Sequence, residues 1–376
     1  MSYSNICSTQ LIWRQHLCSI RTVTILTVYA AIETSFDETA IAICDKRGQI
    51  AAALLSSQVE LHAPYGGCVP ELAARTHLSD LPQLWRKLPV ELVDQLTHIG
   101  VTAGPGLPGC LLAGVNFARG VSRALKLPLY GLNHLSGHIF SPFIPEQSAP
   151  AEAVFYPHIA LLISGGHTEL FLVKGLTDIT LLGQTHDDAV GELLDKVSAI
   201  LGHGYPGGAV LEQIALCHPG IEDGASYAGK FQLPVPMRDS GDLNFSYSGL
   251  KTAVLRLVRG GNLAGEQVIP VEEHPSLLAA LFNVVAESLW IKAKVAVAEH
   301  GVELLTVSGG VAINSIIRSR FTNGAQSVGI NVHYPAPRHC LDNAEMMAWL
   351  TKLTVDAGID PAPFDADSNW NPGLPR

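Results

Sequence analysis

Two stretches of the chain share one arrangement of apolar and polar positions. In the first, the apolar run TILTVYAAIE (24–33) leads into the polar turn TSFDETA, after which IAICD is apolar again. In the second, AVFYPHIALLISGGHTELFLVKG (153–175) places a small polar turn between two apolar runs. Short apolar runs bounded by turn residues predict strands, so each stretch is expected to form a β-hairpin. A further strand, IAAALLSS (50–57), is predicted after the turn DKRGQ.

Glycine-containing connections lead from other apolar runs into helical patterns. Three segments predict a strand that runs into a helix: 96–125, 127–138 and 303–321. Further helices are expected at 187–202, 208–218 and 274–300, the last one mostly within the core. Each half of the chain thus opens with a hairpin and continues into helices and more strands. This recurrence predicts a duplicated α/β domain with a cleft between the halves.

The length of 376 residues also favours two domains. The proline-rich stretch 141–150 is the expected boundary, which gives an N-terminal α/β lobe over 25–150 and a C-terminal α/β lobe with a helical insertion over 151–376. Residues 1–24 are expected to be an extension, disordered or transit-like. The first 32 residues of the chain contain no acidic residue and include Arg14 and Arg21. Three interpretations of this composition stay open: a misassigned start, an upstream extension and an organellar transit peptide.

Composition narrows the function classes. Hydrophobic residues make up 47% of the chain and charged residues 15%, which predicts a folded protein with a large core. The formal net charge of −10 argues against general nucleic-acid binding, and leaves a local basic face or the help of a partner. The seven scattered cysteines contain no C-x-x-C, which predicts a reducing compartment and no disulfide framework. No apolar run is expected to reach the length of a membrane span.

Four glycine-bearing turns are candidates for anion binding, because backbone N–H groups in such turns point outward together. They are expected to follow strands, at 104–109, 164–168, 205–208 and 308–314. None matches the P-loop or the dinucleotide fingerprint. Two of the turns read SGG in a duplicated chain, which predicts a nucleotide between the lobes, with its phosphate on one turn and its nucleoside on the other.

Two further stretches carry candidate chemistry. NHLSGH places His134 and His138 four residues apart, on one face of a helix, where they form a metal-ligand pair or simply two satisfied histidines. The turn ETSFDET sets Asp37 and Glu38 beside Ser35. Acids in such a turn hold Mg²⁺, position water or act as a base; capping of the turn is the alternative.

Nine stretches in order resemble the universal tRNA threonylcarbamoyladenosine transferase family, of the bacterial and organellar TsaD type, formerly described as an O-sialoglycoprotein endopeptidase. They are IETSFDETAIAI, SSQVELHAPYGGCVPELAARTHL, GPGLPGCLLAGVNFARG, NHLSGH, LLISGGHTEL, DDAVGELLDKVSAILGHGYPGG, NFSYSGLKTAV, VSGGVAINS and YPAPRHCLDNAEMMA. The resemblance extends from about residue 25 to about residue 350. It implies the duplicated actin/Hsp70/sugar-kinase-like (ASKHA) fold, with two lobes and a central nucleotide cleft.

The resemblance also implies site residues. Its metal ligands match His134, His138 and Asp342, and the ion is iron, with zinc as the alternative and Mg²⁺ accompanying the nucleotide. Its reactive turn matches Ser35, Asp37 and Glu38. Its adenylate pocket matches Leu162, Ile163, Ser164, Gly165, Gly166, Asp195, Gly208, Glu212 and Asn314. Two residues depart from the family: Phe36 replaces a cysteine, which removes any cysteine-dependent step there, and Ser136 replaces a common glutamate.

The implied reaction transfers a threonylcarbamoyl group from threonylcarbamoyl-AMP to N6 of the adenosine beside the anticodon, in tRNAs that read codons beginning with A. The implied partners are tRNA and either a paralogous dimerisation partner with a small ATPase or a second copy of the chain in an organelle. A cytoplasmic location is expected, with mitochondria or another organelle as the alternative. Competing interpretations are an ATPase or kinase of the same fold and a non-catalytic scaffold paralogue. A metalloprotease is disfavoured, because the spacer Leu-Ser-Gly lacks the glutamate of H-E-x-x-H.

Overall fold

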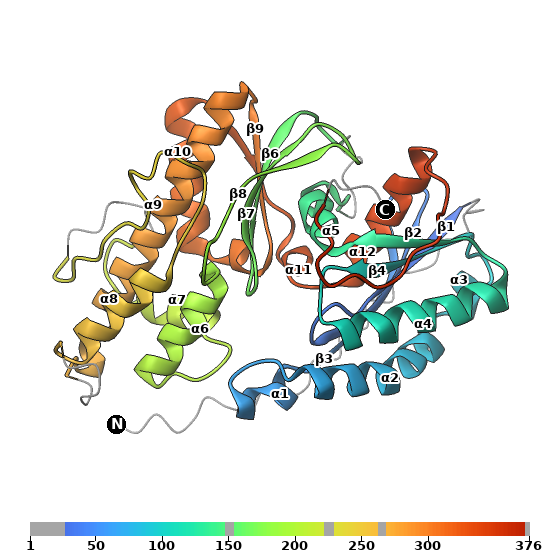
Figure 1. The fold of residues 1–376 in the computed structure, drawn as a ribbon, viewed down its shortest axis with the longest axis horizontal. Coiled ribbons are helices and arrows are strands. Elements are labelled where there is room, and N and C mark those ends of the chain that lie inside the picture. Colours follow the sequence, from blue (N-terminus) through green and yellow to red (C-terminus); the bar gives the residue numbers. More distant parts are fainter. Residues whose placement is uncertain (1–26, 147–153, 222–228, 262–267, 373–376) are drawn as a thin grey trace.

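The computed structural model describes residues 27–146, 154–221, 229–261 and 268–372. The expected extension over residues 1–24 lies outside these ranges. Two five-stranded mixed sheets form the framework (Figure 1). The first sheet contains β1 (Val28–Glu33), β2 (Glu38–Asp45), β3 (Ile50–Ser57), β4 (His98–Gly104) and β5 (Leu129–Asn133). The second contains β6 (His158–Ile163), β7 (Thr168–Val173), β8 (Ile179–Gln184), β9 (Leu304–Ser308) and β10 (Asn331–His333).

The two sheets have the same topology. The order is β3-β2-β1-β4-β5 in the first sheet and, read from the matching edge, β8-β7-β6-β9-β10 in the second. In each sheet the first three strands are antiparallel neighbours, and the last two run parallel to the first. The predicted hairpins and the predicted duplication are therefore confirmed.

Helices cover both sheets. In the first half they are α1 (Val59–His62), α2 (Pro70–Lys87), α3 (Val90–Val93), α4 (Pro108–Leu125) and α5 (His134–Phe140). In the second half they are α6 (Val190–Leu201), α7 (Gly208–Ala215), α8 (Ser248–Val258), α9 (His274–His300), α10 (Ser315–Val328), α11 (Pro337–Cys340) and α12 (Ala344–Asp356). Helices α2 and α4 pack on the first sheet (Figure 1), while α9 packs on β6 and against α7 and α10.

Strand β1 shows how the period of two divides the core. Its residues Ala30 and Ile32 face one cluster, which includes residues of α2 and α4. Tyr29 and Ala31 point the other way, into a central cluster that also contains residues of β6, β7, α5 and α12. Helices α5 and α12 therefore lie between the two sheets. The residue at the end of β1 on this inward face is Glu33, which is fully buried.

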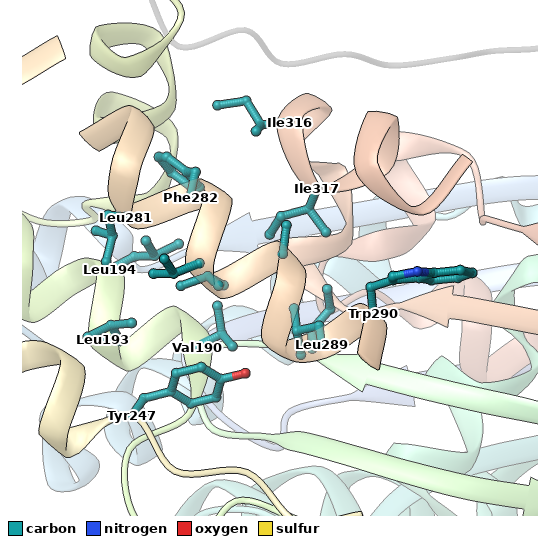
Figure 2. Close-up of a cluster of buried hydrophobic side chains, with 14 of the residues drawn as sticks. Val190, Leu193, Leu194, Tyr247, Leu281, Phe282, Leu289, Trp290, Ile316 and Ile317 are labelled. Atoms are coloured by element: carbon teal, nitrogen blue, oxygen red, sulfur yellow. The ribbon is translucent and has the colours of Figure 1, made fainter. Parts of the chain in front are cut away.

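The second lobe has its own core around α9. Figure 2 shows side chains of α9, including Leu281, Phe282 and Leu289, against residues of α6 and α10. The segment Val271–His300 is long and apolar enough to cross a membrane by length and composition, so the expectation that no run reaches this length is wrong. Because 78% of its apolar window is buried inside the protein, the apolarity of α9 is explained by core packing.

The chain returns to the first lobe at its end. Helix α12 packs on β1, β2 and β4 of the first sheet and against α5. Helices α5 and α12 pack closely at Gly137, where an added Cβ would lie 2.6 Å from Sδ of Met347. The expected division of the chain at about residue 150 stays a prediction.

Candidate functional site

The two histidines of the NHLSGH motif lie one turn apart on α5. Asn133 caps this helix, because its side-chain oxygen accepts a hydrogen bond from the backbone N–H of Ser136 at 3.1 Å. His134 and His138 follow four residues apart, and their ring centroids are 4.8 Å apart. Both side chains are buried. The helix therefore presents two imidazoles on one face, toward the space between the sheets.

Asp342 reaches the same point from the other end of the chain. It precedes Asn343, which caps α12 by accepting from the N–H of Met346 at 2.8 Å. The Oδ1 atom of Asp342 lies 3.0 Å from Nε2 of His138 and 3.6 Å from Nε2 of His134. One donor atom from each of the three residues lies within 4.8 Å of the others. Two imidazoles and one carboxylate form a donor set that suits a divalent transition metal.

Glu33 was not among the sequence-predicted site residues, yet it supports this group directly. Its Oε2 lies 3.1 Å from Nδ1 of His134 and accepts a hydrogen bond from Thr102, while its Oε1 accepts from the N–H of Ser35 at 2.5 Å. A carboxylate on Nδ1 fixes the imidazole tautomer and leaves Nε2 free to bind a cation. The available signal was an acid at the end of a buried strand, but burial is not visible in one sequence.

The charges around the histidines fit a cation. Burial by itself lowers the pKa of His134, but the carboxylates of Glu33 and Asp342 outweigh it and raise this pKa to about 9. Burial raises the pKa of Asp342, and the facing imidazoles more than reverse this, so the net pKa is well below the usual range. The fully buried Glu33 and the partly buried Asp342 thus demand positive charge beside them, which either a protonated His134 or a divalent ion supplies.

The turn between β1 and β2 lies beside this group. Ser35 places its hydroxyl 3.1 Å from Nδ1 of His134, so it contacts a metal-ligand candidate. Burial raises the pKa of Glu38 to about 8; its Oε1 accepts from Ser57, and its Oε2 has no partner in the part of the chain that the structure describes. Burial also raises the pKa of Asp37. The turn therefore offers carboxyl groups suited to proton transfer near neutral pH.

Phe36 and His167 connect the two lobes across this site. The ring of Phe36 lies edge-on to His134 at 5.9 Å and to His167 at 6.5 Å between centroids. Burial and the facing rings of His134 and His138 lower the pKa of His167 to about 4, so it is neutral at neutral pH. His167 was not among the sequence-predicted site residues, although it stands in the SGGHT motif. The ring of Phe36, a position where the resemblance implies a cysteine, thus contacts His134 of α5 and His167 of the turn between β6 and β7.

Hydrogen bonds between loops and helix ends bring together the residues matched to the adenylate pocket. In the SGG turn after β6, the carbonyl oxygen of Ser164 accepts a hydrogen bond of 3.1 Å from the N–H of Gly191, at the start of α6. Asp195 of α6 accepts from the N–H of Gly207 at 2.7 Å, which fixes the start of α7 at Gly208. Gly165 and Gly166 are exposed, with open space where a Cβ would lie.

The second SGG turn, after β9, contacts both α7 and the end of β6. Asn314 caps α10 by accepting from the N–H of Ile317, and the next residue, Ser315, donates to Oε1 of Glu212 from both its N–H at 2.7 Å and its hydroxyl. Gly309 has a φ of +91°, and a Cβ there would lie 2.4 Å from the carbonyl oxygen of Ile163. The two SGG turns therefore meet at the ends of β6 and β9, two neighbouring strands of the second sheet, so both lie in the second half of the chain.

The structure corrects two sequence expectations, on the side chains of the adenylate pocket and on the turn at 205–208, and agrees with a third, on the cysteines. The side chains of Leu162 and Ile163 are fully buried in core clusters, so only their backbone groups are available to a ligand. The turn 205–208 follows helix α6, which ends at Gly202 in the left-handed conformation, and so does not follow a strand. The five cysteines of the described ranges are free thiols, as expected for them.

Comparison with known proteins identifies the family. Residues 49–349 match the family described as tRNA N6-adenosine threonylcarbamoyltransferase. A protein of that name from Aromatoleum aromaticum is 43% identical over 332 residues, which cover 87% of this chain and 91% of the relative. Another from Thermosipho africanus is 41% identical over 336 residues, which cover 88% of this chain and 96% of the relative.

Solved structures confirm the fold. Full-length HypF in its phosphate- and nucleotide-bound form superposes with a TM-score of 0.55 at 11% identity, over 89% of this chain and 47% of that one. At this identity the likeness shows the fold alone. With the repeated sheet topology, it establishes the duplicated ASKHA architecture. The family implies a metal-binding enzyme, and the structure presents groups that could hold the ion. The chain belongs to the tRNA N6-adenosine threonylcarbamoyltransferase family and is a transferase that forms threonylcarbamoyladenosine in tRNA.

Proposed function

We propose that the chain takes the threonylcarbamoyl group from threonylcarbamoyl-AMP and transfers it to the adenosine beside the anticodon, in tRNAs reading codons that begin with A. The observation that carries the proposal is the convergence of His134, His138 and Asp342 between the two sheets. A kinase or ATPase of the same fold needs no such donor set. A scaffold paralogue has no need to retain it either.

The glycine turns are the proposed adenylate site. Gly165 and Gly166 let a nucleotide approach the backbone, because no side chain occupies the space beside them. Glu212 uses Oε1 to hold Ser315 and keeps Oε2 for a ribose hydroxyl, which is a strong donor to a carboxylate. The pocket assignment also includes Ser164, Asp195, Gly208 and Asn314, and the backbone of Leu162 and Ile163.

Glu38 is the proposed base that takes the proton from the attacking N6 amine, with Asp37 as the alternative and Ser35 as a positioning group on His134. Burial raises the pKa of Glu38 to about 8, close to the working pH at which a general base is effective. Its Oε2 has no partner among the described residues. Glu38→Gln should lower single-turnover transfer by about 100-fold or more while adenylate binding stays near wild type. A wild-type rate would move the role to Asp37.

His134, His138 and Asp342 are the proposed ligands of one divalent ion, which we assign as iron, with zinc as the alternative. When bound, such an ion supplies a Lewis acid that polarises the threonylcarbamoyl carbonyl. The protein orients the ligands through Glu33 and Ser35 on His134. Mg²⁺ is proposed to accompany the nucleotide phosphate.

The proposed partners follow from the charge of the chain. A net charge of −10 is poor for holding tRNA alone, so we propose a complex with a paralogous subunit and a small ATPase, or a homodimer in an organelle. A cytoplasmic location is proposed, with mitochondria as the alternative.

The decisive experiment supplies premade threonylcarbamoyl-AMP and unmodified tRNA to the purified full chain, with and without the candidate partners. AMP release and modified adenosine should appear together, and a chelator should abolish both. His134→Ala should lose the metal bound at this site and transfer in parallel. Full metal content in a His134→Ala, His138→Ala double variant would refute the ligand assignment.

A further inference from the structure

A second group of metal-ligand residues shares Asp37 with the reactive turn, and its other two members take no part in the proposed chemistry. It consists of Asp37 in the β1–β2 turn, His62 at the end of α1, and Cys68 in the loop before α2. One donor atom of each lies within 4.8 Å of the other two. A thiolate, an imidazole and a carboxylate are all ligands of Zn²⁺, which tolerates mixed S, N and O donors.

A chain of buried hydrogen bonds prepares His62 for such a role, and it begins at His77. The carbonyl oxygen of Phe36 can only accept, so Nε2 of His77, 2.8 Å away, carries the hydrogen. Burial lowers the pKa of His77, so the ring is neutral and its Nδ1 is an acceptor. Thr39 donates to this Nδ1 at 2.7 Å, and the Gln58 amide nitrogen lies 3.4 Å from it.

The orientation of Gln58 then fixes His62. With its NH₂ group toward His77, Gln58 turns its carbonyl oxygen to Nε2 of His62 at 3.3 Å. That oxygen can only accept, so a hydrogen lies on Nε2 of His62. Among the described residues, Nδ1 accepts only from the N–H of Val69, at a long 3.3 Å, so the lone pair lies on Nδ1. An amide oxygen on the far nitrogen is how proteins orient metal-binding histidines.

The loop that carries Cys68 can close on an ion. Bonds of about 2.0–2.3 Å to Zn²⁺ place donors roughly 3.5 Å apart, so the present spacing needs a contraction of about 1 Å. Gly66 and Gly67 precede Cys68, and open space lies where a Cβ would stand at each of them, so no side chain packs against the loop there. Cys68 is half-buried, and Asp37 is held in place by its carbonyl, which accepts from the N–H of Gln58 at 3.2 Å.

We infer that Asp37, His62 and Cys68 form a second metal site, selective for Zn²⁺ and separate from the site of His134, His138 and Asp342. Three protein donors leave the fourth tetrahedral position open, and it lies beside the reactive turn. The site stands on donors of its own, so it does not depend on the assignment of the first site.

The test uses the full-length chain, stripped of metal by a chelator and titrated with Zn²⁺ and then with Co²⁺. Wild type should bind two equivalents, and its Co²⁺ form should show a thiolate-to-cobalt charge-transfer band in the near ultraviolet. Cys68→Ser should bind one equivalent and lose the band. The His134→Ala, His138→Ala double variant should also bind one equivalent but keep the band.

Cys217→Ser is the matched control, because Cys217 is an exposed thiol away from this group and its loss should leave stoichiometry and band unchanged. A wild-type protein without the charge-transfer band would overturn the inference, and this measurement needs no variant. An unchanged stoichiometry of two in folded Cys68→Ser, checked by circular dichroism, would overturn it as well.

Discussion

Replacement of Glu33 by glutamine is the sharpest test of how the protein holds His134. Both oxygens of Glu33 act only as acceptors, one for the N–H of Ser35 and the other for Thr102 and Nδ1 of His134. Glutamine has nearly the same shape but replaces one acceptor by an NH₂ donor. If the remaining oxygen stays with Ser35, the NH₂ group faces Nδ1 of His134. The imidazole hydrogen must then move to Nε2, the atom that faces Asp342.

These contacts set the expected loss of metal affinity and of folding stability in Glu33→Gln. Loss of a partner that orients a metal-binding histidine typically lowers metal affinity by about 10–100-fold, or about 1.4–2.8 kcal/mol. If the amide turns the other way, its NH₂ group faces the N–H of Ser35, and a buried unsatisfied donor costs about 1–3 kcal/mol of folding free energy. Glu33→Gln should therefore lose metal affinity, folding stability or a share of both.

The assay is competition with a chromophoric chelator for Zn²⁺ at fixed pH. The affinity compared is that of the one Zn²⁺ equivalent that the His134→Ala, His138→Ala variant does not bind. Urea unfolding of the metal-free chain is measured alongside. Glu169→Gln is the matched control: it is another buried carboxylate, whose pKa burial raises to about 7, and it makes none of these contacts to His134. The control should bind metal like wild type. If Glu33→Gln kept both its metal affinity within about twofold and its unfolding midpoint, the orienting role would be wrong.

Three other substitutions probe the geometry. Gly309→Ala should destabilise by about 2 kcal/mol or more, since φ is +91° and the new Cβ would meet the carbonyl of Ile163 at 2.4 Å; an unchanged urea midpoint would contradict this. Gly137→Ala should cost about 1–2 kcal/mol and weaken metal binding, because crowding against Met347 exceeds the gain in helix propensity; wild-type values in both would contradict it. Burial lowers the pKa of His158 from 6.5 to about 4, so its neutral form contributes stability in full above pH 6.5 that is lost as pH falls toward 4. Wild type should lose roughly 3 kcal/mol over that window relative to His158→Phe, measured by urea unfolding at each pH, and parallel pH profiles would disprove it.

Local patterns were enough to predict the parts of the fold that depend on them. The hairpins and strand–helix units follow from periods of two and 3.6 residues, and the shared face of His134 and His138 follows from their spacing. The place of Asp342 does not follow, because it lies 204 residues beyond His138 and meets it only through the packing of α12. Only the family resemblance pointed to it.

Buried polar groups were harder to predict. Glu33 looks like an ordinary strand-end acid, and its role depends on which face of β1 turns inward.

The turn at 205–208 resembled the strand-end glycine turns because composition does not tell which element precedes a loop. The net charge of −10 left tRNA as a substrate open, since an average over the chain says little about a tRNA-modifying enzyme that works with local surfaces or partners.

The return of α12 to the first sheet sets the order in which the enzyme can be completed during synthesis. The ribosome makes β1 to β5 and α5 early, but α12 emerges near the end of translation. Until then Tyr29 and Ala31 lack their cover from α12, and the two histidines lack their carboxylate. A nascent or truncated chain that stops before residue 342 therefore leaves this apolar surface uncovered, and the proposed donor set is complete only once α12 has docked.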